Sequence, residues 1–129
     1  MKRTAYNPSA SLTFPGMSQS VRWKDLIFLS GQCSMDEAGT TVGEGDPEAQ
    51  VRQCFRNIET LLAHEGATLA DVVKLTCFVV DMDVYPAYAA VKKELFPTDG
   101  PAGTTVIVKG LLNPSFLLEV DATAVVPSS

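Results

Sequence analysis

The stretch FLLEVDATAVV, residues 116–126, has the two-residue alternation of a β-strand that buries one face. One set of alternate positions is apolar throughout and consists of Phe116, Leu118, Val120, Ala122 and Ala124. The other set carries two carboxylates and consists of Leu117, Glu119, Asp121 and Thr123. The stretch therefore predicts a sheet with one face packed on helices and the two carboxylates together on the open face.

The segments before this strand alternate between strand-like and helix-like patterns. Residues 18–31 resemble a β-hairpin, because apolar segments flank the polar pair Lys24 and Asp25. Asp46 and Pro47 are typical of a helix start, and apolar residues recur behind them at helical spacing until Gly66. Residues 71–81 are apolar on both faces, which favours a central strand. A second helix is expected over residues 84–96, and another strand after Gly103.

The resulting order, β-β-α-β-α-β-β, predicts an α+β fold in which both helices cover one face of a mixed sheet. A length of 129 residues suits one domain, so a single domain is expected over residues 1–129. About ten residues at the start and the final PSS are expected to be loosely held termini.

Composition disfavours several classes of protein. Apolar residues make up 46% and charged residues 19% of the chain, as in ordinary globular proteins. The longest apolar run is too short for a membrane span, and residues 1–10 lack the apolar centre of a signal peptide, so a cytoplasmic protein without membrane contact is expected. The net charge of −5 and the scattered lysines and arginines disfavour a nucleic-acid partner.

The cysteines and the histidine show no pattern of a metal or catalytic centre. Cys33, Cys54 and Cys77 are an odd number without metal-ligand spacing, so free thiols in a packed core are expected rather than a disulfide or a zinc site. His64, the single histidine, stands late in the first expected helix. It is expected to be a solvated surface residue, because the sequence places no partner for acid-base catalysis beside it.

Gly103 stands at the start of an expected strand, where glycine indicates a bulge, a bend or the close approach of another group. If this strand neighbours the last strand, and if Val106 and Val108 face the helices, Gly103 and Glu119 lie on the open face together. That face would remain strongly apolar, with Ile107 and Leu117 on it. We therefore expect partner subunits to cover it.

Six segments resemble the RidA/YjgF family, which is also labelled endoribonuclease L-PSP or translation inhibitor. They span about residues 14–126 and read SQSV, FLSGQ, EAQVRQCFRNIETLL, GATLADVVKLTCFVVDM, FPTDGPAGTTVIV and LLEVDATAV. The resemblance implies a chorismate-mutase-like subunit in a homotrimer, whose sheets form a central barrel with three intersubunit clefts that bind small molecules. Catalytic members hydrolyse reactive enamines and imines, such as 2-aminoacrylate, to 2-oxo acids and ammonia without a metal or other cofactor.

The resemblance also implies roles for individual residues. A glutamate that positions the attacking water corresponds to the catalytic candidate Glu119, whereas an arginine that holds the substrate carboxylate corresponds to Gly103. Further departures from the family pattern are Met17 for a tyrosine, Thr105 for a cysteine and Ala89 for an asparagine. The expected substrate cleft consists of Gly103, Thr105, Met17, Gly31 and Cys33.

Loss of the arginine leaves two functions open. The first is hydrolysis of an enamine or imine without arginine anchoring of a carboxylate, with weak or absent activity on 2-aminoacrylate. The second is a non-catalytic trimer that binds a small molecule, in which Glu119 pairs with a backbone N–H or with Lys109. RNA cleavage and translation inhibition are disfavoured.

Three further side chains have open roles. Lys109 and Arg22 are the candidate replacements for the arginine, although a charged residue in a strand is usually solvated. Cys33 is expected to be a small residue that fills a strand position. A reactive thiol is the alternative, and it would require a lowered pKa.

Overall fold

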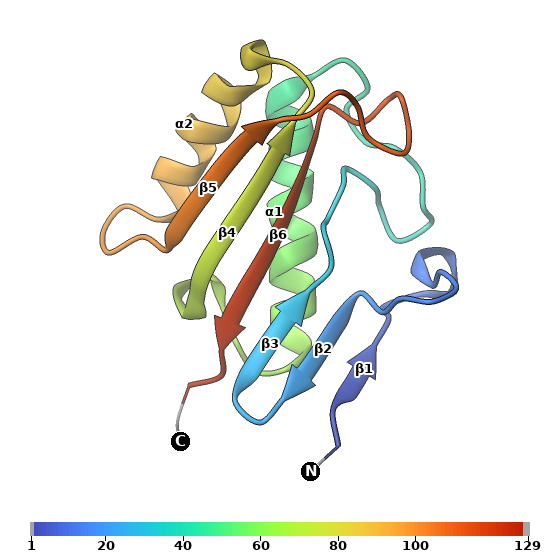
Figure 1. The fold of residues 1–129 in the computed structure, drawn as a ribbon, viewed down its shortest axis with the longest axis vertical. Coiled ribbons are helices and arrows are strands. Elements are labelled where there is room, and N and C mark those ends of the chain that lie inside the picture. Colours follow the sequence, from blue (N-terminus) through green and yellow to red (C-terminus); the bar gives the residue numbers. More distant parts are fainter. Residues whose placement is uncertain (1, 128–129) are drawn as a thin grey trace.

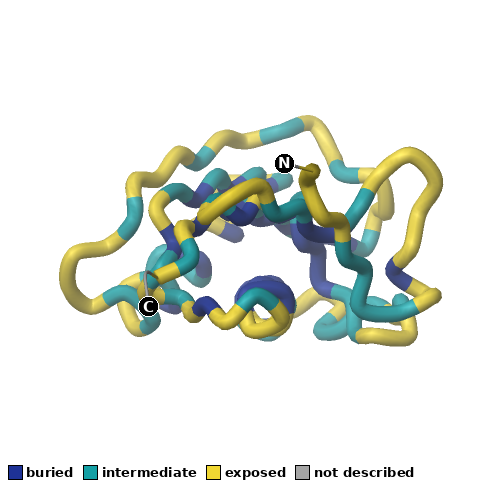
Figure 2. Tube along the Cα trace, turned by 90° about the horizontal axis from the view of Figure 1, so that it is seen from below, coloured by how far each residue is buried: buried dark blue, intermediate teal, exposed yellow. Residues whose placement is uncertain are grey.

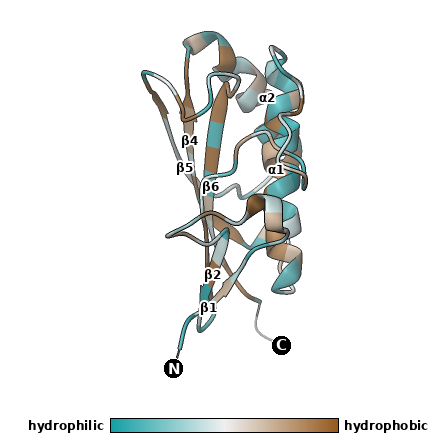
Figure 3. Ribbon diagram, turned by 90° about the vertical axis from the view of Figure 1, so that its right-hand side faces the viewer, coloured by the Kyte–Doolittle hydropathy of each residue, from teal (hydrophilic) through white to brown (hydrophobic). Residues whose placement is uncertain are grey.

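A mixed sheet with two α-helices on one face makes up the described part of the chain, residues 2–127, in the computed structural model (Figure 1). The strands lie in the order β1-β2-β3-β6-β4-β5, and only β4 and β5 run parallel to each other. Their bounds are β1 Thr4–Tyr6, β2 Ser20–Trp23, β3 Leu26–Leu29, β4 Val72–Val79, β5 Ala102–Ile107 and β6 Leu118–Val125. The helices are α1, Pro47–His64, and α2, Tyr85–Leu95, and both cover the same side of the sheet (Figure 3). This arrangement confirms the expected α+β class.

Local signals in the sequence fix where several elements begin and turn. The side chain of Asp46 accepts a hydrogen bond from the Ala49 N–H at 3.1 Å, which satisfies a free donor at the start of α1. Gly66 follows α1 with a φ of +74°, in the left-handed region that favours glycine. The predicted hairpin is β2 and β3, which turn at Lys24 and Asp25.

The core lies between the helices and the sheet, where buried segments gather in Figure 2. The apolar face of β6 is buried as predicted, because Leu118, Val120, Ala122 and Ala124 are each at most 2% exposed. Phe55 of α1 and Tyr88 of α2 are 1% exposed and stack with ring centroids 5.9 Å apart. The helices are thereby packed against each other as well as on the sheet.

The N-terminal segment differs from the prediction of a loose end. Residues Thr4–Tyr6 form β1, which pairs antiparallel with β2 and adds a strand to the expected order. The ring of Tyr6 stacks on His64 with centroids 3.5 Å apart, so the segment is held at the end of α1. A three-residue strand is too short to show alternation, which explains why the sequence did not reveal it. At the other end, Ser128 and Ser129 lie outside the described residues.

The position of β5 corrects a second expectation. β5 and β6 are not neighbours, because β4 lies between them. Gly103 pairs with Leu75, Thr105 with Cys77 and Ile107 with Val79. The β4 members of these pairs are buried towards the helices, so Gly103, Thr105 and Ile107 face the helix side and not the open side.

The physical reason is the connection through α2. A strand, a crossover helix and a second strand form a βαβ unit, which places β5 parallel to β4 at the sheet edge. At such an edge both faces of β5 are accessible, and Val106 and Ile107 are 40% and 55% exposed on opposite faces. Alternation alone therefore did not distinguish the two faces of β5.

Candidate functional site

The carboxylate of Glu119 lies on the open face of the sheet beside the segment that follows β3. Glu119 pairs with Phe78 across β6 and β4 and is partly exposed. The Cys33 thiol donates a hydrogen bond to Glu119 Oε1 at 3.1 Å. Within residues 2–127 no other hydrogen bond or ion pair reaches this carboxylate. One oxygen is thus anchored, while Oε2 keeps its capacity to accept a hydrogen bond.

Gly31 provides the space that the Glu119 side chain occupies. A Cβ on Gly31 would lie 2.6 Å from Glu119 Cδ and 2.8 Å from Cγ, and it would overlap Oε2. The backbone of Gly31 has no positive φ, so a larger residue is disfavoured here by the position of the Glu119 side chain and not by backbone conformation. The carboxylate therefore lies directly over the Gly31 backbone.

Backbone pairing fixes the segment that carries Gly31 and Cys33. The Gln32 N–H donates to the Val120 carbonyl at 2.7 Å, and the Val120 N–H donates back to Gln32 at 3.0 Å. The Asn57 side chain of α1 donates to the Cys33 carbonyl at 3.0 Å. Cys33 and Glu119 are consequently held by neighbouring, hydrogen-bonded segments of backbone.

Cys33 is suited to act as a neutral donor. Burial raises the pKa of this thiol, and the adjacent Glu119 carboxylate raises the pKa further. A thiolate at this position would be desolvated and repelled by the carboxylate. The environment thus favours the protonated thiol and disfavours the reactive alternative for Cys33.

The loop with Met17 lies along the same segment. Ser30 Oγ donates to the Ser18 carbonyl at 2.6 Å, and the Ser30 N–H donates to the Gln19 carbonyl at 2.9 Å. Gln32 Nε2 also donates to Gln19 Oε1 at 2.9 Å. Met17 is 43% exposed next to these contacts. The structure thus brings together Glu119, Gly31 and Cys33, with the Met17 loop tied to the same backbone.

Gly103 and Thr105 form a separate region on the helix side of the sheet. A Cβ on Gly103 would lie 3.7 Å from Lys92 Nζ and 3.9 Å from the Leu75 carbonyl oxygen, which are ordinary contacts. Gly103 also has no positive φ. Neither crowding nor backbone conformation therefore requires glycine at position 103, in contrast to the bulge, bend or close approach that the sequence indicated.

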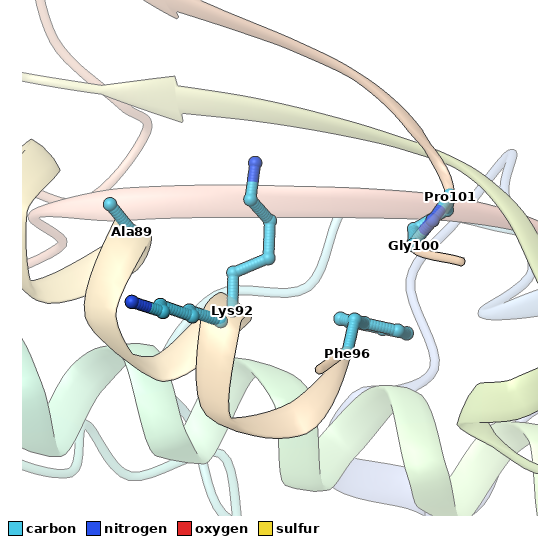
Figure 4. A pocket seen from close by; sticks show the side chains of 6 residues that line it. Ala89, Lys92, Phe96, Gly100 and Pro101 are labelled. Carbon is cyan, nitrogen blue, oxygen red and sulfur yellow. The ribbon is translucent and has the colours of Figure 1, made fainter. Parts of the chain in front are cut away.

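Beside Gly103 is a cavity of about 130 Å³ between α2 and the loop that leads into β5 (Figure 4). Its lining is partly basic and partly apolar and comprises Ala89, Lys92, Lys93, Phe96, Gly100 and Pro101. The resemblance implies an asparagine at the position of Ala89. The two departures at positions 89 and 103 are therefore close to one cavity.

The cations considered from the sequence lie elsewhere. Arg22 binds Glu65 with an N–O distance of 3.1 Å and also donates to the Lys24 carbonyl, so its guanidinium is engaged at the end of α1. Lys109 follows β5, is exposed and makes no ion pair within the described residues. The cation that the sequence reasoning missed is Lys92. Its position four residues after Tyr88 on α2 was the available signal, because it places Lys92 next to the apolar face of that helix.

No group of three or more metal-ligating side chains is assembled within residues 2–127. Cys33, Cys54 and Cys77 are separate, buried thiols. In the same part of the chain, no helix is both long and apolar enough to cross a membrane.

Fold and site define a small α+β protein with a glutamate anchored by a thiol on the open face of its sheet. The family model described as Endoribonuclease L-PSP matches residues 9–126, and the chain belongs to this family. The resemblance to RidA/YjgF proteins is thereby confirmed.

Named relatives and solved structures agree with this assignment. The chain is 32% identical over 110 residues to a 2-iminobutanoate/2-iminopropanoate deaminase of Dermatophagoides farinae, with 85% of this chain and 86% of the relative covered. It is 35% identical over 100 residues to the 3-aminoacrylate deaminase RutC of Acinetobacter baylyi, with 78% and 79% covered. The crystal structure of yeast Mmf1 matches with a TM-score of 0.89 and 25% identity over 98% of this chain and all of that chain.

Proposed function

We propose that this protein is a hydrolase of small reactive enamines or imines in which Glu119 positions the attacking water. The observation that carries the proposal is the Glu119 carboxylate, anchored through Oε1 by the Cys33 thiol and free at Oε2. The deaminases among its relatives act, by their names, on imino and amino derivatives of small carboxylic acids. Those names support the same class of substrate for this chain.

In the proposed reaction Glu119 acts as a general base. A water that donates to Oε2 would have its oxygen directed at a carbon atom held above the open face, and the carboxylate would accept the proton as the oxygen adds. The tetrahedral adduct then loses ammonia once the nitrogen is protonated, and a carbonyl group remains. An imine and one water thus give one carbonyl product and one ammonia, without an external oxidant or reductant.

Gly103 predicts a slower reaction on 2-aminoacrylate than an arginine would allow. A guanidinium holds a carboxylate by two parallel charge-assisted hydrogen bonds, each worth about 1.5–3 kcal/mol. Loss of both lowers binding and positioning by on the order of a hundredfold or more, at about 1.4 kcal/mol per factor of ten. We therefore propose a weak or absent rate on 2-aminoacrylate relative to an arginine-bearing relative.

We further propose that several copies of the chain assemble, with a homotrimer as the expected form. The open face exposes Phe28 to 46% and Val106 to 40%, and these apolar side chains favour a covering partner. Glu119 on the open face and Gly103 on the helix side belong to one cleft only if two copies contribute to it. Sedimentation analysis of the wild-type protein tests the assembly, and a monomer at micromolar concentration would contradict it.

The hydrolase is tested with imines generated in the assay from several amino acids, together with neutral imines. Release of the carbonyl product is compared with the spontaneous rate. Glu119→Gln keeps the size of the side chain and removes the base, so we expect the catalysed rate to fall by about 10²–10⁴-fold. Asp121→Asn is the matched control, because Asp121 lies on the same face two residues further along β6, whereas the Cys33 thiol donates its hydrogen bond to Glu119.

The second candidate function is a non-catalytic binding protein, which the missing arginine favours. That function expected a backbone N–H or Lys109 at Glu119, whereas the described contact is the Cys33 thiol. If the wild-type protein binds small 2-oxo acids but accelerates no imine in the panel, the binding function replaces the hydrolase. Equal rates for the wild-type protein and Glu119→Gln would remove the role proposed for Glu119.

A further inference from the structure

Lys92 is a partly buried lysine that lacks a carboxylate partner. It projects from α2 towards β4 and β5, and its Nζ lies 5.0 Å from the centre of the Tyr88 ring. Within residues 2–127 it forms no ion pair, whereas Arg52 of α1 pairs with Glu48 and Glu94. An ammonium group in this position has three donors and no anionic acceptor among the described residues.

The charged end of Lys92 lies beside the edge strand β5. A Cβ on Gly103 would lie 3.7 Å from Nζ, so the amine lies against the strand edge. The same positive charge acts on Cys77, where it opposes the burial that raises the pKa of that thiol to about 12. Absence of a side chain at position 103 keeps the approach to this amine open.

The cavity next to the amine has the size and lining for a small organic anion. At about 130 Å³ it is far larger than the roughly 10–15 Å³ that one water requires. Phe96 and Ala89 supply apolar walls, and Lys93 adds a second positive charge at the lining. Figure 4 shows Gly100 and Pro101 across the cavity from α2. A small molecule with an anionic group and an apolar part could therefore contact both the lysines and the apolar walls of the cavity.

We propose that Lys92 binds the carboxylate of the substrate, as a single-point cation supplied by helix α2. The identity of that ligand as substrate rests on the proposed hydrolase, but the anion site itself does not. A lysine ammonium is a compact point charge, whereas a guanidinium provides a planar two-point grip. The site therefore selects small carboxylates by charge and volume, and it fixes the orientation of the carboxylate less strictly.

The test uses pyruvate and 2-oxobutanoate as stable probes, with pyruvamide as the neutral analogue. Dissociation constants are measured by calorimetry or ligand-observed NMR for the wild-type protein, Lys92→Met, Lys92→Arg and the control Lys109→Met, which removes an exposed lysine outside the cavity lining. Hydrogen bonds to charged groups predict that Lys92→Met weakens pyruvate binding by about 10–100-fold. Pyruvamide binding is expected to change less than threefold, Lys92→Arg to retain pyruvate binding, and Lys109→Met to lose less than threefold.

Several results would overturn the site. They are the absence of pyruvate binding to the wild-type protein, unchanged binding by Lys92→Met, or equal losses in Lys92→Met and Lys109→Met, which would indicate a diffuse positive potential. Thermal unfolding of each variant shows whether the fold is intact, and Lys92→Arg provides the comparison if Lys92→Met does not fold.

Failure of this proposal is distinguishable from failure of the hydrolase. Pyruvate binding that depends on Lys92, without turnover of any imine, leaves the anion site standing and contradicts the hydrolase. If turnover of imines with and without a carboxylate depends on Glu119 but is unchanged by Lys92→Met, the hydrolase stands and the role of Lys92 in substrate binding is contradicted.

Discussion

The substitution Gly31→Ala is expected to move the Glu119 carboxylate while it leaves the fold nearly as stable as in the wild-type protein. The added Cβ would lie 2.6 Å from Glu119 Cδ, whereas ordinary contacts begin near 3.4 Å, so Cδ must move by about 0.8 Å. The atoms that must move belong to a flexible, partly exposed side chain and not to backbone. The substitution therefore displaces the carboxylate with little strain on the sheet.

The expected effect on stability is small and the expected effect on turnover is large. The movement lengthens the 3.1 Å contact between Cys33 Sγ and Glu119 Oε1, which costs about 1 kcal/mol as a typical net hydrogen bond. Displacement of a reactive group by about 1 Å costs about a hundredfold in rate. We thus expect turnover to fall by two orders of magnitude while the free energy of unfolding falls by less than about 2 kcal/mol.

The assay combines imine hydrolysis with urea unfolding. Gly110→Ala is the matched control, because a Cβ there has nothing within 4 Å and Gly110 has no positive φ. Its turnover and stability are expected to equal those of the wild-type protein. Turnover of Gly31→Ala within threefold of the wild-type rate would refute the role assigned to the carboxylate position. A stability loss above about 4 kcal/mol would instead show that Gly31 is needed for folding.

Two further predictions concern stability. Gln50 is fully buried, donates to the carbonyls of Gly43 and Ser115, and accepts from the Leu117 N–H. Gln50→Ala leaves these buried groups unpaired, so we expect the free energy of unfolding in urea to fall by about 2–4 kcal/mol. A fall of less than about 0.5 kcal/mol would contradict this. Burial raises the pKa of the Cys54 and Cys77 thiols above their ordinary value near 9, so above pH 9 the unfolded chain binds fewer protons than the folded chain. The free energy of unfolding is therefore expected to fall there by about 1.4 kcal/mol per pH unit for each such thiol, and constant stability from pH 8 to 10.5 would disprove it.

Elements with one buried and one open face were predictable from sequence. The alternation in β6 correctly assigned its buried residues because that face packs on α1. Asp46 with Pro47 marked the start of α1 because unpaired N–H groups there need an acceptor. Glu119 on the open face followed from the same alternation.

Features that depend on strand order were not predictable. β5 is an edge strand with exposed residues on both sides, so its alternation was compatible with either orientation of Gly103. Lys92 was missed for a related reason, since a lysine beside an apolar helix face has the sequence pattern of a solvated side chain. Its proximity to Gly103 arises only when α2 crosses behind β4 and β5.

The positions of the Gly103 region and the Glu119 region on the sheet predict how turnover depends on protein concentration. Gly103 and Glu119 are two strands apart and three register positions apart, on opposite faces, since Gly103 aligns with Leu75 and Glu119 with Phe78. Strand spacing and rise place them about 10 Å apart across the sheet and about 10 Å along it. A small imine cannot reach both regions of one chain.

If the substrate contacts both Lys92 and Glu119, as we propose, turnover requires a second copy, whereas the Lys92 cavity is formed by one chain. When the protein is diluted until sedimentation shows dissociated chains, we expect the turnover per chain to fall in proportion to the assembled fraction. Pyruvate binding, followed by NMR at the same dilution, is expected to persist within threefold. Turnover per chain that is independent of assembly would mean that one copy contains the complete site, and it would contradict the division of the cleft between two copies.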